Sequence, residues 1–144
     1  MAILVCTVVV SLCLASASGA GERTLACTDL PQDEKEARTP AQQKINSQLL
    51  YEIYRRRGEA QRKGVPPGDT LVRIDHAGRA LVDVRAHVTA ALERQIRRLG
   101  GRIVTTTPSL DSIVAWMPLL KLERLAESPA VRAIEPAATA MTVR

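Results

Sequence analysis

Residues 80–101 have the sequence ALVDVRAHVTAALERQIRRLGG, in which the spacing of apolar residues changes halfway. Up to position 88 apolar and polar residues alternate, which predicts a strand over 80–88. From Thr89 on, apolar residues recur at helical spacing, which predicts a helix that Thr89 caps and Gly100-Gly101 ends. The apolar face of the strand consists of Val82, Val84, Ala86 and Val88, and that of the helix consists of Leu92, Ile96 and Leu99.

Three more strands and a second helix are predicted downstream. Residues 102–107 are β-branched, residues 112–117 alternate again, and the turn at 108–111 joins the two strands as a hairpin. A short helix follows Pro118, and a last strand covers 131–135. The order β-α-β-β-α-β predicts an α+β, ferredoxin-like domain over 70–136, in which two helices cover one face of an antiparallel sheet.

Upstream of residue 80 the sequence predicts a helix, a linker, a short strand and a turn. Residues 70–74 predict a strand, residues 75–78 a turn, and the Pro/Gly run at 65–69 a linker. Residues 39–64 predict one amphipathic helix that starts at a capping box and is weakened by Gly58 before Gly64 ends it. Its solvated side carries what we call the basic patch: Arg55, Arg56, Arg57, Arg62 and Lys63.

The first 38 residues differ in character from the rest. Residues 1–20 carry no charge and contain small-residue cleavage patterns, which predicts a signal peptide and a secreted, periplasmic or extracellular protein. No stable membrane anchor is expected after signal cleavage. Residues 21–38 are polar and predict a disordered leader. Because Cys27 is the single cysteine after the signal, we expect no intramolecular disulfide.

Four stretches together form a pattern of regularly spaced apolar residues with Gly or Pro at the ends of elements. They are VDV at 82–84, LGGRIV at 99–104, SIVAWMP at 112–118 and LERLAESPAVRAIE at 122–135. Together they resemble the propeptides of subtilisin-like serine proteases. The resemblance implies a non-catalytic inhibitory prodomain. Its partner would be a subtilisin-like protease domain, either in cis in a longer precursor or in trans.

The same resemblance implies two contact regions. The sheet face that carries Asp83, Arg85 and His87 would meet the protease. An extended tail would pass through the active-site cleft by β-strand pairing, and its small side chains suit that role. The tail consists of Ala137, Ala138, Thr139, Ala140, Met141, Thr142, Val143 and Arg144. An unpaired, disordered C-terminus is the alternative for these residues.

Catalytic chemistry finds little support in the sequence. The two histidines, His76 in a turn and His87 on a strand, lack a nucleophile elbow, and with Cys27 they lack metal-ligand spacing. No Gly-rich phosphate loop is present. We therefore expect no enzyme activity, metal or cofactor. The Asp, His and Ser elements of a protease are absent from the 144 residues, so a free-standing inhibitor and a truncated protease precursor both stay open.

The basic patch suggests an alternative function, a secreted domain that binds an acidic partner or surface. Nucleic acid is not the expected partner, because the protein is predicted to be exported. Tyr51 and Tyr54 fall on or beside the apolar stripe of the helix, which favours packing over base stacking. Trp116 lies in a strand that two helices are predicted to cover, so it is expected to be packed.

Overall fold

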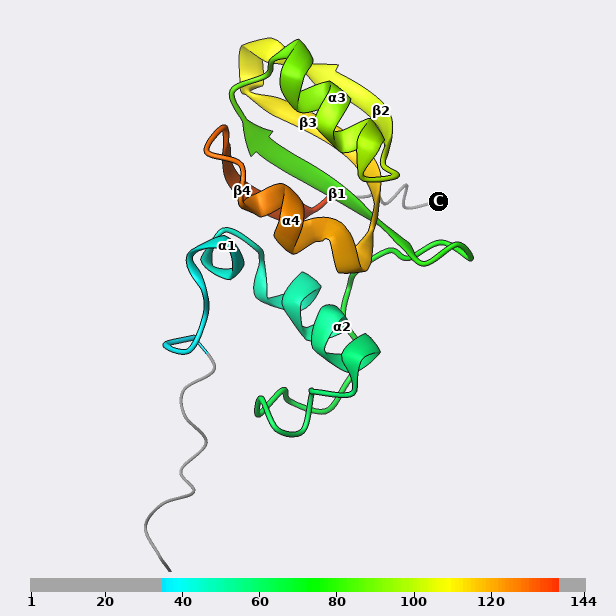
Figure 1. Cartoon of the computed structure of the whole chain (residues 1–144). Helices are drawn as coiled ribbons and strands as arrows, with labels where there is room; N and C mark the ends of the chain where they lie inside the picture. Colours follow the sequence, from blue (N-terminus) through cyan, green and yellow to red (C-terminus); the bar gives the residue numbers. More distant parts are fainter. Residues whose placement is uncertain (1–34, 138–144) are drawn as a thin grey trace, which may run out of the picture.

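The computed structural model describes residues 35–137 (Figure 1). The α+β class and the four-stranded antiparallel sheet are confirmed. The predicted signal peptide, residues 21–34 of the leader and the tail beyond Ala137 lie outside the described residues. The elements, with η for a 3-10 helix, are α1 (Pro40–Gln43), α2 (Ser47–Arg57), β1 (Arg79–Ala86), α3 (Ala90–Arg98), β2 (Arg102–Thr107), η1 (Pro108–Leu110), β3 (Ser112–Pro118), η2 (Leu119–Lys121), α4 (Leu122–Ala126) and β4 (Val131–Pro136).

The strands lie in the order β2-β3-β1-β4, and all neighbours are antiparallel. β1 is central, so that Val84 pairs with Ile113 of β3 on one side and with Ile134 of β4 on the other. Each edge strand has one extra residue, Val104 in β2 and Arg132 in β4, where the register shifts. Such bulges twist an edge strand and disfavour pairing with another chain.

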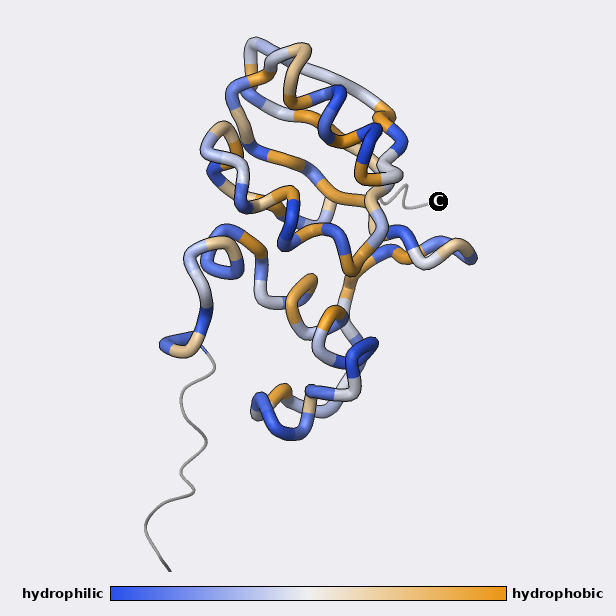
Figure 2. The backbone as a smooth tube through the Cα atoms, in the orientation of Figure 1, coloured by the Kyte–Doolittle hydropathy of each residue, from blue (hydrophilic) through white to orange (hydrophobic). Residues whose placement is uncertain are grey.

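Helices cover one face of the sheet. Figure 1 shows α3 and α4 over this face, with α1 and α2 beside α4. Leu92 and Ile96 of α3 are buried against it, as their spacing predicted, and Thr89 caps the helix by accepting a hydrogen bond from the Leu92 N–H. Figure 2 shows the result as a hydrophobic β1 beneath a largely hydrophilic α3. The buried apolar strand residues are Ala80, Val82, Val84, Ala86, Ile113, Ala115, Met117, Val131 and Ile134.

The C-terminal end of α3 lies close to β3 because two glycines follow it. Gly100 has a φ of 87°, in the left-handed region that ends a helix at little cost only for glycine. A Cβ on Gly101 would lie 2.2 Å from the Met117 Sδ atom and 2.9 Å from the Ile96 carbonyl oxygen. The missing side chain therefore allows α3 to pack directly on the strand.

The prediction of one continuous helix over 39–64 is wrong, because the helix is interrupted. The capping box at Thr39 is present, but α1 ends at Gln43 and α2 begins at Ser47. Between them Ile45 pairs in parallel with Ile134 of β4, because the Asn46 N–H donates to the Ile134 carbonyl (2.9 Å) and the Ile134 N–H to the Lys44 carbonyl (2.7 Å). Bonding to the edge strand thus replaces helical bonds. α2 then ends before Gly58, whose φ is 71°.

The strand predicted over 70–74 is also wrong. This segment makes one isolated bridge, from Ile74 to Ala80, and Leu71 is 86% exposed. Side chains of α2 hold it instead, since Thr70 donates to Glu52 (2.6 Å) and the Leu71 N–H donates to Gln48 (3.2 Å). The predicted turn at 75–78 is confirmed, with a hydrogen bond from the Gly78 N–H to the Asp75 carbonyl. Turn chemistry thus predicted the local structure of residues 75–78 correctly, whereas apolar alternation over 70–74 did not produce a strand.

Candidate functional site

The face of the sheet opposite the helices carries side chains from all four strands, and we call it the open face. The helices of residues 35–137 lie on the other side (Figure 1). Strand register brings Leu81 opposite Trp116, and Asp83 opposite both Val114 and Glu135. The open face includes Leu81, Asp83, Arg85, Arg102, Thr105, Thr107, Ser112, Val114, Trp116, Ala133 and Glu135.

A polar cluster lies at one end of the open face. The Ser112 hydroxyl, in a residue only 8% exposed, donates to Asp83 Oδ1 at 2.6 Å. Arg85 Nη2 lies 3.0 Å from the other Asp83 oxygen. Both carboxylate oxygens are therefore engaged, so the charge of Asp83 is balanced within the sheet. The structure brings the predicted contact residues Asp83 and Arg85 together, with Ser112 as a partner that the sequence did not indicate.

His87, the third predicted residue of this face, lies apart from that pair. β1 ends at Ala86, and the His87 N–H donates to the Ala130 carbonyl. Its side chain is 81% exposed, with Nδ1 3.7 Å from Asp111, which also accepts a hydrogen bond from Arg132. His87 thus lies at the rim of the open face.

The other end of the open face is apolar and half-buried. It consists of Leu81, Val114 and Trp116, and the Arg73 guanidinium lies 5.7 Å from the centre of the Trp116 ring. The prediction that Trp116 packs beneath the helices is wrong, because its register with Leu81 places it on the opposite side of the sheet. Arg73 was missed by the sequence analysis, since it comes from a segment predicted as a strand.

The last described residue lies beside this apolar end. The Ala137 N–H donates to the Leu81 carbonyl at 3.1 Å, and the Leu81 N–H donates to the Arg73 carbonyl at 2.9 Å. Next along β1, the Asp75 N–H donates to the Arg79 carbonyl. The segment 73–75 therefore occupies the place beside the start of β1, and Ala137 is the last described residue bonded to β1 on the β4 side. Residues 138–144 of the predicted tail lie outside the described residues.

Most cations of the basic patch already have partners. Arg55 pairs with Glu52 at 2.7 Å, Arg62 with Glu59 at 3.3 Å, and Arg57 with Glu123. Lys63 lies 5.6 Å from the centre of the Tyr54 ring, and Arg56 has no ion-pair partner within residues 35–137. The patch is therefore less able to attract an acidic partner than its sequence indicated.

Glu123 of α4 joins the upstream helices to the domain. It accepts hydrogen bonds from Gln42 of α1 (2.7 Å) and from Arg57 at the end of α2. Burial raises the pKa of Glu123, but these hydrogen bonds and the Arg57 charge outweigh burial, so its pKa is held below the ordinary value. The same hydrogen bond raises the pKa of Arg57. Both groups thus stay charged at neutral pH.

Glu123→Gln is expected to lower the free energy of unfolding by about 1 kcal/mol at pH 7, because it removes a partly exposed ion pair but keeps an amide. Because the pKa of Glu123 is lower in the folded chain, its carboxylate stabilises the fold at pH values above its ordinary pKa of 4.5. This contribution to the free energy of unfolding is lost as the pH falls through the lowered pKa. Urea unfolding between pH 7 and pH 3 should therefore show the difference shrinking below about pH 4.5. Glu127→Gln, at an exposed neighbouring pair, is the control, and an equal effect there would contradict this role.

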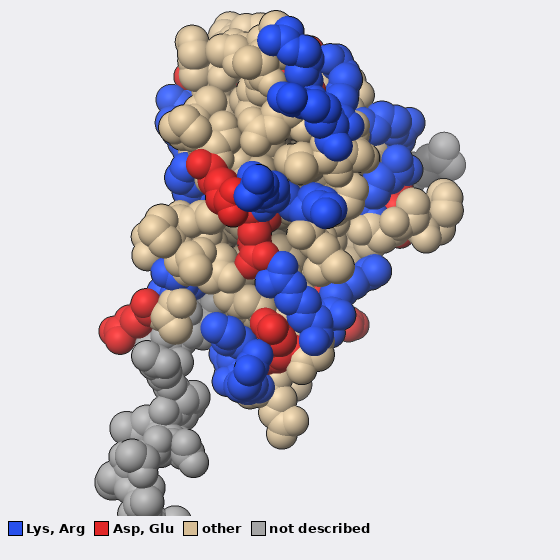
Figure 3. Space-filling model, in the orientation of Figure 1, with Lys and Arg blue, Asp and Glu red and all other residues tan. Residues whose placement is uncertain are grey.

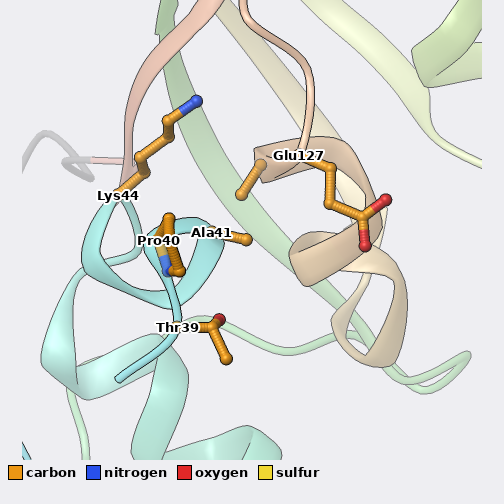
Figure 4. A pocket seen from close by; sticks show the side chains of 6 residues that line it. Thr39, Pro40, Ala41, Lys44 and Glu127 are labelled. Carbon is orange, nitrogen blue, oxygen red and sulfur yellow. The ribbon is translucent and has the colours of Figure 1, made fainter. Parts of the chain in front are cut away.

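A shallow pocket of about 420 Å³ lies between α1 and the end of α4. In Figure 4 the Glu127 carboxylate points away from it, and Lys44 Nζ donates to the Ser128 carbonyl at 3.1 Å. No titratable group is therefore presented to a ligand inside this pocket. Its lining consists of Thr39, Pro40, Ala41, Lys44, Ala126 and Glu127.

Residues 35–137 contain no group of three His, Cys, Asp or Glu side chains placed to hold a metal ion. None of their helices has the length and apolar character needed to cross a membrane. In comparisons with known proteins, no family model, curated protein or solved structure matches this chain. Among residues 35–137, the open face combines apolar and polar side chains from all four strands, and Ala137 is hydrogen-bonded beside its apolar end.

Proposed function

We propose that this protein is a secreted, non-catalytic module that binds a subtilisin-like serine protease as a propeptide does, in cis or in trans. The observation that carries the proposal is the open face, which presents half-buried Leu81, Val114 and Trp116 beside the point where β4 ends. We further propose that the domain is of the ferredoxin-like kind. The strand order β2-β3-β1-β4 and the sequence β-α-β-β-α-β from Arg79 onward support that assignment.

The chemistry of the open face suits a protein partner. Interfaces commonly bury an apolar centre, often with an aromatic residue, inside a polar rim. Here Trp116 and Val114 supply the apolar centre. Thr105, Glu135 and His87 are exposed and supply the rim. Because the Asp83 charge is already balanced by Arg85 and Ser112, docking would not leave it unpaired.

The tail is proposed to enter the protease cleft in an extended form. Main-chain pairing of this kind takes its affinity from backbone hydrogen bonds, and small side chains leave the backbone accessible to a partner strand. Residues 137–140 are Ala-Ala-Thr-Ala, and the hydrogen bond from Ala137 to Leu81 fixes the start beside the apolar end of the open face. A partner seated on that end would lie close to Ala137, the first residue of the tail.

Titration of residues 21–144 into a panel of subtilisin-like proteases tests this function, with hydrolysis of a small peptide substrate as the readout. We expect tight inhibition of at least one protease. A chain ending at Ala137 should inhibit that protease at least tenfold less, while its circular dichroism spectrum is unchanged. Absence of inhibition by a folded chain across the panel would contradict the proposal, and equal inhibition by the shortened chain would contradict the role of the tail.

A further inference from the structure

The outer surface of the helix layer carries an unbalanced set of cations, which we call the helix-layer cluster. Figure 3 shows Lys and Arg side chains gathered over α3, and Lys and Arg side chains beside Asp and Glu side chains over α4. Arg94, Arg98 and Lys121 are exposed and make no ion pair with any residue in 35–137. In this part of the chain, Arg97 pairs only with the half-buried Glu93, and Arg124 pairs only with the exposed Glu127. The cluster consists of Arg94, Arg97, Arg98, Lys121 and Arg124.

The fold fixes the direction in which these cations point. Leu92 and Ile96 are buried against the sheet, so the residues at 94, 97 and 98 lie together on the outer side of α3. A Cβ on Gly100 would lie 3.3 Å from the Pro118 ring, which places the end of α3 beside the start of η2. Lys121 of η2 therefore belongs to the same layer as the α3 cations.

An exposed leucine precedes Lys121 of this cluster in the chain. Leu120 of η2 is 48% exposed, whereas its neighbour Leu119 is buried. A surface with long cationic side chains around an apolar one matches the interface of an anionic bilayer. The cations can reach lipid phosphates while the leucine enters the boundary between headgroups and acyl chains. A nucleic acid is a poorer match, because the described aromatic residues Tyr51, Tyr54 and Trp116 lie on α2 or on the open face.

We propose that the helix layer docks on an anionic lipid surface through the helix-layer cluster and Leu120. The inference goes beyond the proposed function and does not depend on it. Because the open face lies on the other side of the sheet, the two surfaces can be occupied together. The occupant is assigned by charge complementarity, since the cluster holds five cations against Glu93 and Glu127.

Sedimentation of the full chain with vesicles tests this inference. One set of vesicles is pure phosphatidylcholine, and the other contains about one third phosphatidylglycerol. We expect binding to favour the anionic vesicles and to weaken as salt is raised. Arg94→Gln combined with Arg98→Gln should lower binding to anionic vesicles about 25-fold, because each cation near such a surface contributes roughly a factor of five to the binding constant. Binding through the apolar run at 2–17 would be equal for both vesicles and unaffected by this variant.

Arg132→Glu is the matched control, because it lowers the net charge by the same amount but changes an exposed residue of the edge strand β4. We expect it to retain at least half of the binding. Equal binding to both vesicles, or equal losses in the control and the double variant, would overturn the proposal. Binding to heparin with none to anionic vesicles would also overturn it, since the cluster would then serve a soluble polyanion.

Discussion

Ile53→Ala is expected to lower the free energy of unfolding of the whole domain by about 2–5 kcal/mol, as for a central residue of the sheet. Ile53 lies on α2, outside the β-α-β-β-α-β order, yet it is fully buried in the same core as the strands. The substitution removes three carbon atoms from a packed site and leaves a cavity. Urea unfolding followed by circular dichroism measures the change, with Ile113→Ala of β3 as the reference.

Arg56→Ala is the control for Ile53→Ala, because it changes an exposed residue of the same helix. Alanine has the higher helix propensity, so this change should stay within about 0.5 kcal/mol. A single unfolding transition that Ile53→Ala moves as a whole would show that α2 and the sheet unfold together. Loss of helical signal alone, with the sheet transition unmoved, would contradict this cooperation.

The helical region upstream of the sheet shows what a local sequence pattern can predict and what it cannot. The spacing of Leu49, Leu50, Ile53 and Tyr54 predicted one apolar stripe, and all four are buried. Nothing local indicated that residues 44–46 would bond to the edge of β4, because that pairing joins positions almost 90 residues apart. The break between α1 and α2 is therefore a tertiary effect that overrides a continuous helical period.

For the open face, the sequence predicted which side chains point to opposite faces of the sheet, but not which face the helices cover. The alternation of β3 correctly separated Ile113, Ala115 and Met117 from Val114 and Trp116. Which set the helices cover depends on the packing of all four strands, and Trp116 was assigned to the wrong side. The polar pair Asp83 and Arg85 was predicted from β1 alone, whereas Ser112 and Arg73 reach this face only through strand register and a distant loop.

The charges of the helix layer were missed for a related reason. Sequence counting favoured the basic patch because five cations fall within nine positions, 55–63. Pairing with Glu52, Glu59 and Glu123 balances three of them, and the Glu123 pair joins residues 66 positions apart. Arg94, Arg98 and Lys121 are less crowded in sequence, yet they have no such partners within residues 35–137. Which of these cations have an acidic partner therefore could not be predicted without knowledge of the fold.

Trp116→Ala is expected to weaken inhibition of the proposed protease partner about 100-fold, or roughly 3 kcal/mol, as for an aromatic residue at the centre of an interface. Trp116 is half-buried on the open face under Arg73, so its removal flattens the apolar end of that face. Leu120→Ala is the matched control, because it removes an exposed apolar side chain from the helix layer and should leave inhibition unchanged.

The two proposed contact regions make different predictions for these variants. A chain ending at Ala137 keeps the open face, so it should still compete with the complete chain for the protease although it blocks the cleft poorly. Trp116→Ala keeps the tail but should compete about tenfold less well than the shortened chain, because docking places the tail at the cleft. Unchanged inhibition by a folded Trp116→Ala variant would show that the open face is not the docking surface, and the proposed function would then rest on the tail alone.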